Sequence, residues 1–289
     1  MMVLLLTMEA GGTMELLDTY CARIGYTGPR TATLDTLRAL QRLHPAAIPF
    51  EAIDVLLGRP ISLAPEAVDA KLIGALRGGY CFEQNNLFQR VLVALGFQVE
   101  PLIAQVQWMA GPEAQQRPRT HMVLRVMVDG QPWLCDVGFG GAVLTGPLRF
   151  DLTTPQSTPH DRYRLTPAGN EHLLEMLLGD DWLPVYLISP APCREGDYLM
   201  ANYYTSTYPQ SHFRHDLIVA RSTPEARHAL LRNRLTTRRL DGGSERRYLT
   251  AGQLEQALSD IFLLPVTPDW RPVIERAAAA VWDEPAERP

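Results

Sequence analysis

The chain has 289 residues, of which 46% are hydrophobic and 20% charged, and its formal net charge is −5. This length can bury one large core, or two to three small ones, without a metal ion or disulfide as support. The acidic balance and the absence of a basic stripe argue against nucleic acid as a partner. Of the 27 basic residues only Lys71 is a lysine. No apolar run approaches the roughly 20 residues that cross a bilayer, so we expect no membrane partner.

The cysteine pattern indicates a reducing compartment. The apolar start, residues 1–7, is short and has no positive leader, so we interpret it as an extended start rather than a signal peptide. The cysteines are widely spaced and contain no C-x-x-C pair; they are Cys21, Cys81, Cys135 and Cys193. Together these features favour free thiols and a cytoplasmic location.

The first hundred residues have helical periodicity. Thr33 precedes an amphipathic stretch that we expect to end at His44-Pro45. A second helix is predicted over 65–76, with proline in its first turn. A third is predicted over 81–95 and should stop at Gly96, a residue type common at helix C-termini. The chain is therefore expected to begin with a helical unit.

From about Gln98 the apolar period changes to two, with turn signals at regular intervals, which predicts an antiparallel sheet or a small barrel. Towards the end the pattern mixes again. Thr250 and Gln253 are spaced as a capping box at the start of a helix. The proline-rich segment after Leu264 is expected to be loosely attached. The order is helical, then β, then a smaller mixed unit.

A hairpin is the strongest local signal in the sequence. Asp129-Gly130 lies between two alternating runs and is a preferred two-residue hairpin loop. With that loop, His121 and Asp136 become diagonal neighbours on one face, with Cβ atoms roughly 7 Å apart or less. Cys135 points to the opposite face, towards the core. The hairpin therefore places a histidine within hydrogen-bonding reach of an aspartate.

The hairpin alone leaves two alternatives open. A longer, four-residue loop would move the pair apart by about two residues. The aspartate could also cap a strand beside an unrelated histidine. The pair becomes more informative when a nucleophile is added to it.

Cys81 has the features of that nucleophile. Gly78 and Gly79 lead directly into the predicted helix and permit a close approach of neighbouring groups. In a first turn, the unpaired backbone N–H groups and the positive end of the helix dipole favour a thiolate. The same N–H groups can donate to an oxyanion. Cys81, His121 and Asp136 together form a complete set for thiol acyl transfer.

Plainer interpretations were also considered. Most free cysteines are small buried hydrophobes, and we expect this of Cys21, Cys135 and Cys193. A zinc site from Cys81, His121 and Cys135 is possible by residue type, but no ligand pair has finger-like spacing, and we predict no metal. The remaining histidines, except His212, are expected at the surface or as caps; they are His44, His160, His172, His215 and His228.

Several segments in one chain order resemble the arylamine N-acetyltransferase family. They are Ile48–Glu51 (IPFE), Asp54–Ile61 (DVLLGRPI), Arg77–Asn85 (RGGYCFEQN), Thr120–His121, Cys135–Gly140 (CDVGFG) and Ser206–Phe213 (STYPQSHF). The combination of R-G-G-x-C with D-V-G-F-G is highly specific. The resemblance covers residues from about 16 to 213 and fades after about 222.

The resemblance implies an α+β fold with a cysteine-protease-like core. It has an N-terminal helical bundle, a central antiparallel β-barrel and a C-terminal α/β lid. The corresponding boundaries are 1–100 for the helical domain with the nucleophile, 101–205 for the barrel with the histidine and aspartate, and 206–289 for the linker and lid.

The resemblance also implies an activity: ping-pong transfer of acetyl from acetyl-CoA to an arylamine, arylhydrazine or arylhydroxylamine, as in xenobiotic metabolism. The triad matches Cys81, His121 and Asp136. Residues matching the acyl and aryl pocket are Phe50, Phe82, Val106, Thr120, Phe139 and Phe213. Glu51 and Arg77 match an ion pair beneath the site, and Asn85 a residue bonded within it. Coenzyme A and a small amine or hydrazine are the expected partners of a monomer or homodimer.

Three other functions remain open at this point. A thiol amidase or hydrolase would use the same triad and release acyl groups to water. An amide synthase within the family would act on a larger antibiotic precursor. A thiol sensor or binding protein would have no catalytic activity.

Overall fold

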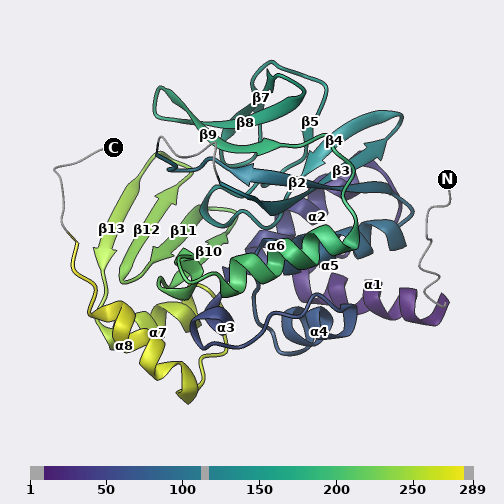
Figure 1. Cartoon of the computed structure of the whole chain (residues 1–289). Helices are drawn as coiled ribbons and strands as arrows, with labels where there is room; N and C mark the ends of the chain where they lie inside the picture. Colours follow the sequence, from purple (N-terminus) through teal and green to yellow (C-terminus); the bar gives the residue numbers. More distant parts are fainter. Residues whose placement is uncertain (1–9, 112–116, 283–289) are drawn as a thin grey trace.

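The N-terminal part of the chain is helical in the computed structural model, which describes residues 10–111 and 117–282 (Figure 1). Its helices are α1 (Ala10–Ile24), α2 (Leu34–Ala47), α3 (Ile53–Leu56), α4 (Pro65–Asp69) and α5 (Cys81–Ala94). The predicted third helix is confirmed, with Gly96 at φ 93° just beyond it. The predicted end of the first is wrong, because α2 continues to Ala47 with Pro45 inside its last turn, where the proline costs one hydrogen bond, to the Gln41 oxygen.

The second predicted helix is also irregular. Helix α4 passes into a single π-helical turn, η1 (Ala70–Gly74), which contains the lone lysine. Short π-helical segments are rare and occur often at functional sites. Leu76 then takes φ 53°, so the chain leaves the helix before the glycines that precede α5.

A strongly curved antiparallel sheet forms the upper part of the molecule in the view of Figure 1. In the described residues its eight strands follow the order β5-β4-β3-β2-β9-β8-β7-β6. The strands are β2 (Gln98–Val106), β3 (Arg119–Val128), β4 (Gln131–Cys135), β5 (Leu148–Arg149), β6 (Gln156–Ser157), β7 (Arg162–Ala168), β8 (Glu171–Leu178) and β9 (Asp181–Ile188). This nearly closed barrel confirms the predicted change from helix to β structure.

A second sheet combines a short strand from the N-terminal helical part with strands from the C-terminal part. Its order is β1-β10-β11-β12-β13 within the described residues. The strands are β1 (Phe50–Glu51), β10 (Ile218–Ser222), β11 (Ala226–Leu231), β12 (Arg234–Arg239) and β13 (Ser244–Tyr248). Phe50 pairs with Ala220 and Glu51 with Val219. The segment that precedes α3 is therefore an edge strand of the C-terminal sheet.

Helices complete the C-terminal part. Helix α6 (Glu195–Thr207) and the short turn η4 (His212–Arg214) connect the barrel to the second sheet, which packs on α7 (Ala251–Asp260), η5 (Pro268–Trp270) and α8 (Arg271–Ala278). The capping box of Thr250 and Gln253 is confirmed by reciprocal hydrogen bonds of 3.4 and 2.9 Å. The prediction of a loosely attached end after Leu264 is wrong as far as residue 282, because Trp270 is only 1% exposed; the rest of that end lies outside the described residues.

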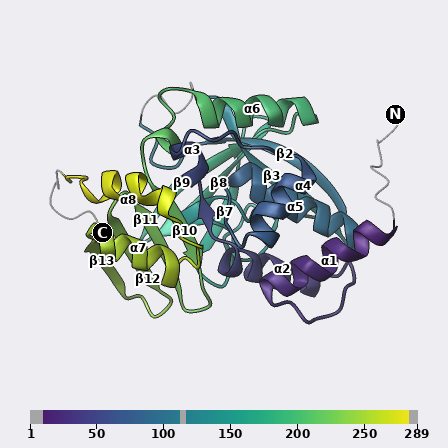
Figure 2. The same cartoon turned by 90° about the horizontal axis from the view of Figure 1, so that it is seen from below.

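Helix α5 lies between α1 and the barrel, as the view from below shows (Figure 2). Its buried face joins one hydrophobic core with α1, α2 and the inner face of the β3–β4 hairpin. Cys135 belongs to this core, as the hairpin pattern predicts. Helix α5, which begins with Cys81, is thus fixed from two sides by apolar packing.

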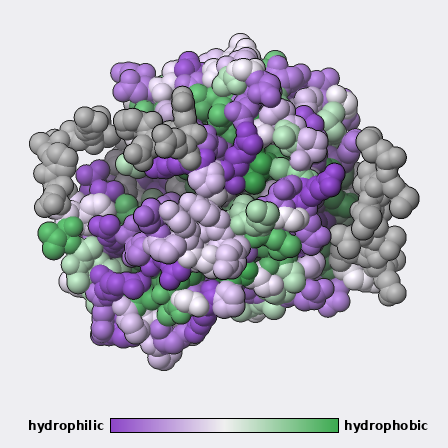
Figure 3. Space-filling view, viewed as in Figure 1, coloured by the Kyte–Doolittle hydropathy of each residue, from purple (hydrophilic) through white to green (hydrophobic). Residues whose placement is uncertain are grey.

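The face seen in Figure 3 carries apolar side chains in small groups among hydrophilic ones. On α6 the side chain of Met200 is 75% exposed. None of the helices in residues 10–111 and 117–282 is both long and apolar enough to cross a membrane.

Candidate active site

The β3–β4 hairpin has the register expected from its turn. Val128 pairs with Gln131 and Leu124 with Cys135, and Asp129 and Gly130 take φ values of 50° and 72°. Both positive φ angles are typical of the two-residue turn that suits the twist of a hairpin.

This register brings the expected pair together. Nε2 of His121 lies 2.7 Å from Oδ2 of Asp136, and the two side chains are almost completely buried. The hydrogen bond forms across the hairpin, between a residue of β3 and the first residue after β4.

Asp136 is held as a carboxylate by several donors. Its Oδ1 accepts hydrogen bonds from the Asn85 amide at 2.9 Å and from the Gly138 N–H at 2.8 Å. Burial raises the pKa of Asp136, but His121, Asn85 and the Gly138 N–H outweigh this and lower it below its ordinary value. The carboxylate therefore stays charged and directs one oxygen at the imidazole.

Cys81 is the first residue of α5, as its sequence context predicts. It is 5% exposed, and its Sγ lies 3.6 Å from the backbone oxygen of Thr120. The thiol also lies close enough to His121 to help raise the pKa of the imidazole. Because Asp136 occupies Nε2, the remaining nitrogen, Nδ1, is the one available to the sulfur.

The environment of His121 favours its charged form. Burial lowers the pKa of the imidazole, but Asp136 and Cys81 together raise it to about 10. Phe139 contacts the ring edge-on at 4.9 Å between centroids, and Tyr186 lies 5.0 Å away. A protonated imidazole between an ionised carboxylate and a thiol is the arrangement that activates a cysteine nucleophile.

At three positions near Cys81, glycine is required because neighbouring atoms leave no room for a Cβ, and not because of an unusual φ angle. A Cβ on Gly78 would lie 2.1 Å from the Pro49 oxygen, and one on Gly79 would lie 2.8 Å from a Glu83 oxygen. A Cβ on Gly138 would lie 2.7 Å from Cα of Cys81. Any side chain at these positions would move the backbone that carries the sulfur.

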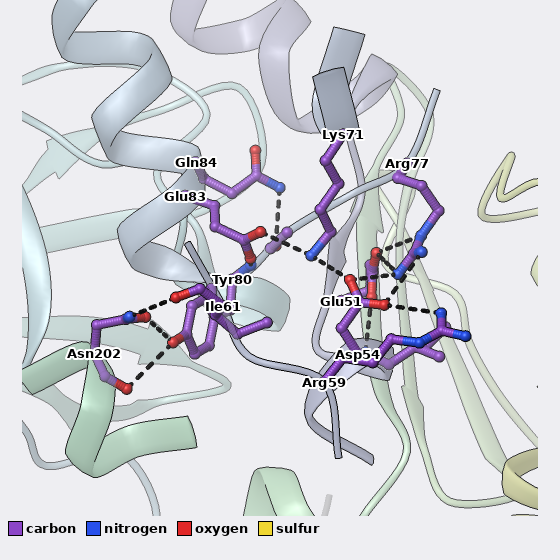
Figure 4. A network of polar contacts seen from close by, with 12 residues as sticks. Glu51, Asp54, Arg59, Ile61, Lys71, Arg77, Tyr80, Glu83, Gln84 and Asn202 are labelled. Carbon is purple, nitrogen blue, oxygen red and sulfur yellow. Dashed lines mark hydrogen bonds and ion pairs between the residues drawn. The ribbon is translucent and has the colours of Figure 1, made fainter. Parts of the chain in front are cut away.

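An ionic network lies beside the first turn of α5 (Figure 4). Arg77 binds Glu51 at 2.7 Å and Asp54 at 3.2 Å. Nζ of Lys71 bridges Asp54 at 2.9 Å and Glu83 at 2.7 Å. The expected ion pair of Glu51 and Arg77 is therefore present, but as part of a larger set of charges.

Helix α6 forms hydrogen bonds with Tyr80, the residue before Cys81. The hydroxyl of Tyr80 donates to the side-chain oxygen of Asn202, whose amide donates to the Ile61 oxygen at 3.0 Å (Figure 4). Because Tyr80 is the N-cap of α5, these bonds connect the position of α6 to that of Cys81.

His44 is not a surface or capping group, so that prediction is wrong. It is fully buried, accepts from the Tyr20 hydroxyl at 2.8 Å and donates to Gln84 at 2.6 Å. The Gln84 amide donates to the oxygens of Pro49 and Gly79 at 2.8 and 3.1 Å, which fixes the direction of the chain of bonds. Burial lowers the pKa of His44 to about 4, so this ring is neutral.

The residues expected to line the pocket do not form one cluster. Phe50 and Phe213 are 6.0 Å apart between ring centroids, and Phe139 contacts His121. Phe82 packs edge-on against Tyr80 and has no exposed surface, so it presents no atom to a ligand in this structure. The half-buried Val106 is paired with Tyr186 across β2 and β9, and Thr120 faces the sulfur through its backbone oxygen.

Tyr186 and Lys71 lie at the site but were not identified from the sequence. Tyr186 belongs to β9, far along the chain from His121, and Lys71 belongs to the π-helical turn. Neither residue is part of a local motif, so only the tertiary fold shows that they belong to the site. The sequence contained one indication of Lys71, because it is the only lysine among the basic residues.

Comparison with known proteins identifies the family. A family model described as N-acetyltransferase matches residues 33–271. The arylamine N-acetyltransferase of Escherichia coli (strain K12) is 42% identical over 218 residues, covering 75% of this chain and 77% of that protein. The Mycolicibacterium smegmatis enzyme is 39% identical over 260 residues, covering 89% and 92%. The chain belongs to the arylamine N-acetyltransferase family.

Solved structures of arylamine N-acetyltransferases have the same fold. The Mycobacterium tuberculosis enzyme superposes with a TM-score of 0.86 at 37% identity, covering 91% of this chain and 100% of that one. The Mycobacterium marinum enzyme, determined in complex with CoA, gives a TM-score of 0.85 at 37% identity, covering 91% and 98%. The predicted α+β fold and the predicted enzyme class are both confirmed.

Proposed function

We propose that this arylamine N-acetyltransferase moves an acetyl group from acetyl-CoA to an arylamine, arylhydrazine or arylhydroxylamine through an acetyl thioester on Cys81. The observation that carries the proposal is the contact of Cys81 with a buried His121 whose other nitrogen is bound to Asp136. The M. marinum relative, determined in complex with CoA, supports coenzyme A as the carrier of the acyl group.

In the first half-reaction, the Cys81 thiolate attacks the thioester carbonyl of acetyl-CoA. The carbon–sulfur bond to coenzyme A then breaks, and the coenzyme A sulfur takes the proton from Nδ1 of His121. Unpaired N–H groups in the first turn of α5 are available to stabilise the oxyanion. Acetyl-Cys81 and a neutral imidazole remain.

In the second half-reaction, the amine nitrogen attacks acetyl-Cys81, and His121 takes the proton that the nitrogen loses. The bond between the acetyl carbon and Sγ breaks, which regenerates the thiolate beside an imidazolium. Asp136 keeps the ring oriented throughout and stabilises its charged form whenever His121 holds the second proton. Phe50, Phe213 and Phe139 are suited to hold an aromatic acceptor and to exclude water.

Intact-mass spectrometry tests the covalent step. After incubation with acetyl-CoA alone, the wild-type chain should gain one acetyl group, and Cys81→Ala should gain none. The acetyl group should then leave when aniline is added. An added mass that persists in Cys81→Ala would show that the nucleophile is another residue.

The same experiment separates transfer from hydrolysis. A thiol hydrolase would release coenzyme A at a rate that does not change when the arylamine is added. For the proposed transferase, the rate of coenzyme A release should rise with arylamine concentration, and the acetylated amine should account for the coenzyme A released.

A further inference from the structure

Lys71 occupies a buried position beside the nucleophile helix. It lies in the π-helical turn η1, and its side chain is only 15% exposed. Its Nζ binds Glu83 at 2.7 Å and Asp54 at 2.9 Å (Figure 4). Burial lowers the pKa of this amine, but Glu83, Glu51 and Asp54 outweigh that effect and raise it, so the group stays protonated.

Glu83 caps the helix that carries the nucleophile. It lies two residues after Cys81, is 2% exposed, and accepts a hydrogen bond from the Tyr80 N–H at 3.0 Å. Its atoms occupy the space that a side chain on Gly79 would need. The carboxylate therefore satisfies one of the N–H groups at the start of α5, next to the sulfur.

The two acidic partners of Lys71 differ in how much they depend on it. Asp54 is also paired with Arg77 at 3.2 Å and with Arg59 at 3.5 Å. In the part of the chain that the structure describes, the ion pair of Glu83 is with Lys71 alone. A buried carboxylate without a cation next to a sulfur that must ionise would oppose that ionisation. The cation of Lys71 thus offsets the negative charge of the cap at the start of α5.

We propose that Lys71 is a positioning residue for acyl transfer, because its ion pair with Glu83 holds the first turn of α5 and cancels the negative charge of the cap beside Cys81. This inference rests on the proposed function, since the charge of the cap matters only if the ionised sulfur is the nucleophile. It concerns the rate at which Cys81 reacts, not the acceptor that the enzyme uses.

Other charged groups surround both Lys71 and Cys81. On the side of Lys71 they are Glu51 from β1, Asp54 from α3 and Arg77 from the loop before α5. On the side of Cys81 they are His121 from β3 and Asp136 from the end of β4. Changing Lys71 removes one partner of Asp54, which keeps Arg77 and Arg59.

A pair of variants separates charge from structure. Glu83→Gln keeps an oxygen for the Tyr80 N–H and leaves Asp54 as a partner for Lys71, but it leaves the lysine charge partly uncompensated. The double variant Lys71→Met with Glu83→Gln removes both charges. The readout is the rate of Cys81 alkylation by iodoacetamide, followed by peptide mass spectrometry over a range of pH.

The single and the double variant are expected to have different midpoints. Glu83→Gln should move the midpoint of the alkylation profile to lower pH, by about half a pH unit. Adding Lys71→Met should move it back to the wild-type value. Arg90→Met is the matched control, because Arg90 pairs with Asp69 of α4 from the distant part of the same helix, and it should leave the midpoint unchanged.

The alkylation midpoints test the role of Lys71 without a measurement of acetyl transfer. An unchanged or raised midpoint in Glu83→Gln, or no reversal in the double variant, would overturn it. Both variants lack a lone buried carboxylate, so the test does not depend on the less stable Lys71→Met single variant. If acetyl-CoA fails to acetylate wild-type Cys81, the proposed function fails, whereas the alkylation midpoints still report on Lys71.

Discussion

The side chain of Asn85 donates a hydrogen bond of 2.9 Å to Oδ1 of Asp136, and so joins the nucleophile helix to the barrel. The same amide donates to the Met122 oxygen at 2.8 Å, and its own oxygen accepts from the Val137 N–H at 3.0 Å. One asparagine therefore fixes the aspartate and both strands of the hairpin relative to α5. The distance between the sulfur and the imidazole depends on this contact.

Replacing Asn85 by alanine should weaken catalysis more than substrate binding. Asp136 would lose one donor, and two backbone groups would be left unpaired. We expect kcat/KM to fall by about 10- to 100-fold and the free energy of unfolding by about 2–3 kcal/mol. Asn86→Ala, at the neighbouring and less buried position, is the control and should change either quantity little. Equal effects of the two substitutions would contradict the role of Asn85.

Gly138 should not tolerate even a methyl group. A Cβ at this position would lie 2.7 Å from Cα of Cys81, so the β4 end of the barrel and the start of α5 would be forced apart. We expect Gly138→Ala to lower kcat about 100-fold or more, because small displacements of reacting groups are costly. Gly141→Ala, whose nearest neighbour would be 3.5 Å away, should retain near wild-type kcat. Steady-state kinetics on both variants tests this difference.

Stability should depend on pH through His121. Its pKa is raised from 6.5 to about 10 by Asp136 and Cys81, against the opposing effect of burial. A raised pKa in the folded state stabilises the fold fully below pH 6.5, and this contribution is lost as the pH rises through about 10. The difference in free energy of unfolding between wild type and His121→Gln should therefore shrink over that range, by a few kcal/mol at most. Urea titrations at several pH values measure it, and a constant difference would refute the assignment.

The C-terminal segment should be essential for stability. Trp270 is 1% exposed, and the Arg77 guanidinium lies 4.7 Å from the centroid of its ring. We expect Trp270→Ala to cost about 3–5 kcal/mol, with increased cleavage of this segment by protease. Trp182→Ala is a matched control on the barrel surface, where Arg164 stacks at 4.5 Å, and it should cost about 1 kcal/mol or less. Similar losses in thermal denaturation would argue against a structural role for Trp270.

The parts of the site that the sequence predicts are those determined by local geometry. The turn at Asp129-Gly130 sets the hairpin register, and the register alone brings His121 and Asp136 together. The place of Cys81 at a helix start follows in the same way from two glycines and a following helical period. In these cases the determining interactions lie within about twenty residues of each other.

The features that were missed or wrong depend on contacts between distant segments. His44 is buried because Tyr20 and Gln84 satisfy both ring nitrogens, and neither partner is near it in the sequence. The segment around Trp270 is held by apolar packing on α7 and the second sheet and by contact with Arg77, although its own composition is typical of a loose end. From sequence alone, a polar or proline-rich segment is predicted to be exposed, because its buried partner lies in a distant part of the chain.

The isolation of Lys71 also makes it a spectroscopic reporter. Because the other basic residues are arginines, an NMR sample labelled only at lysine side chains would give a single signal. That signal would come from the ammonium group bound to Glu83, next to the helix start where chemistry is proposed. Its chemical shift and hydrogen-exchange rate would follow the cap through each half of the catalytic cycle, in the unmodified enzyme.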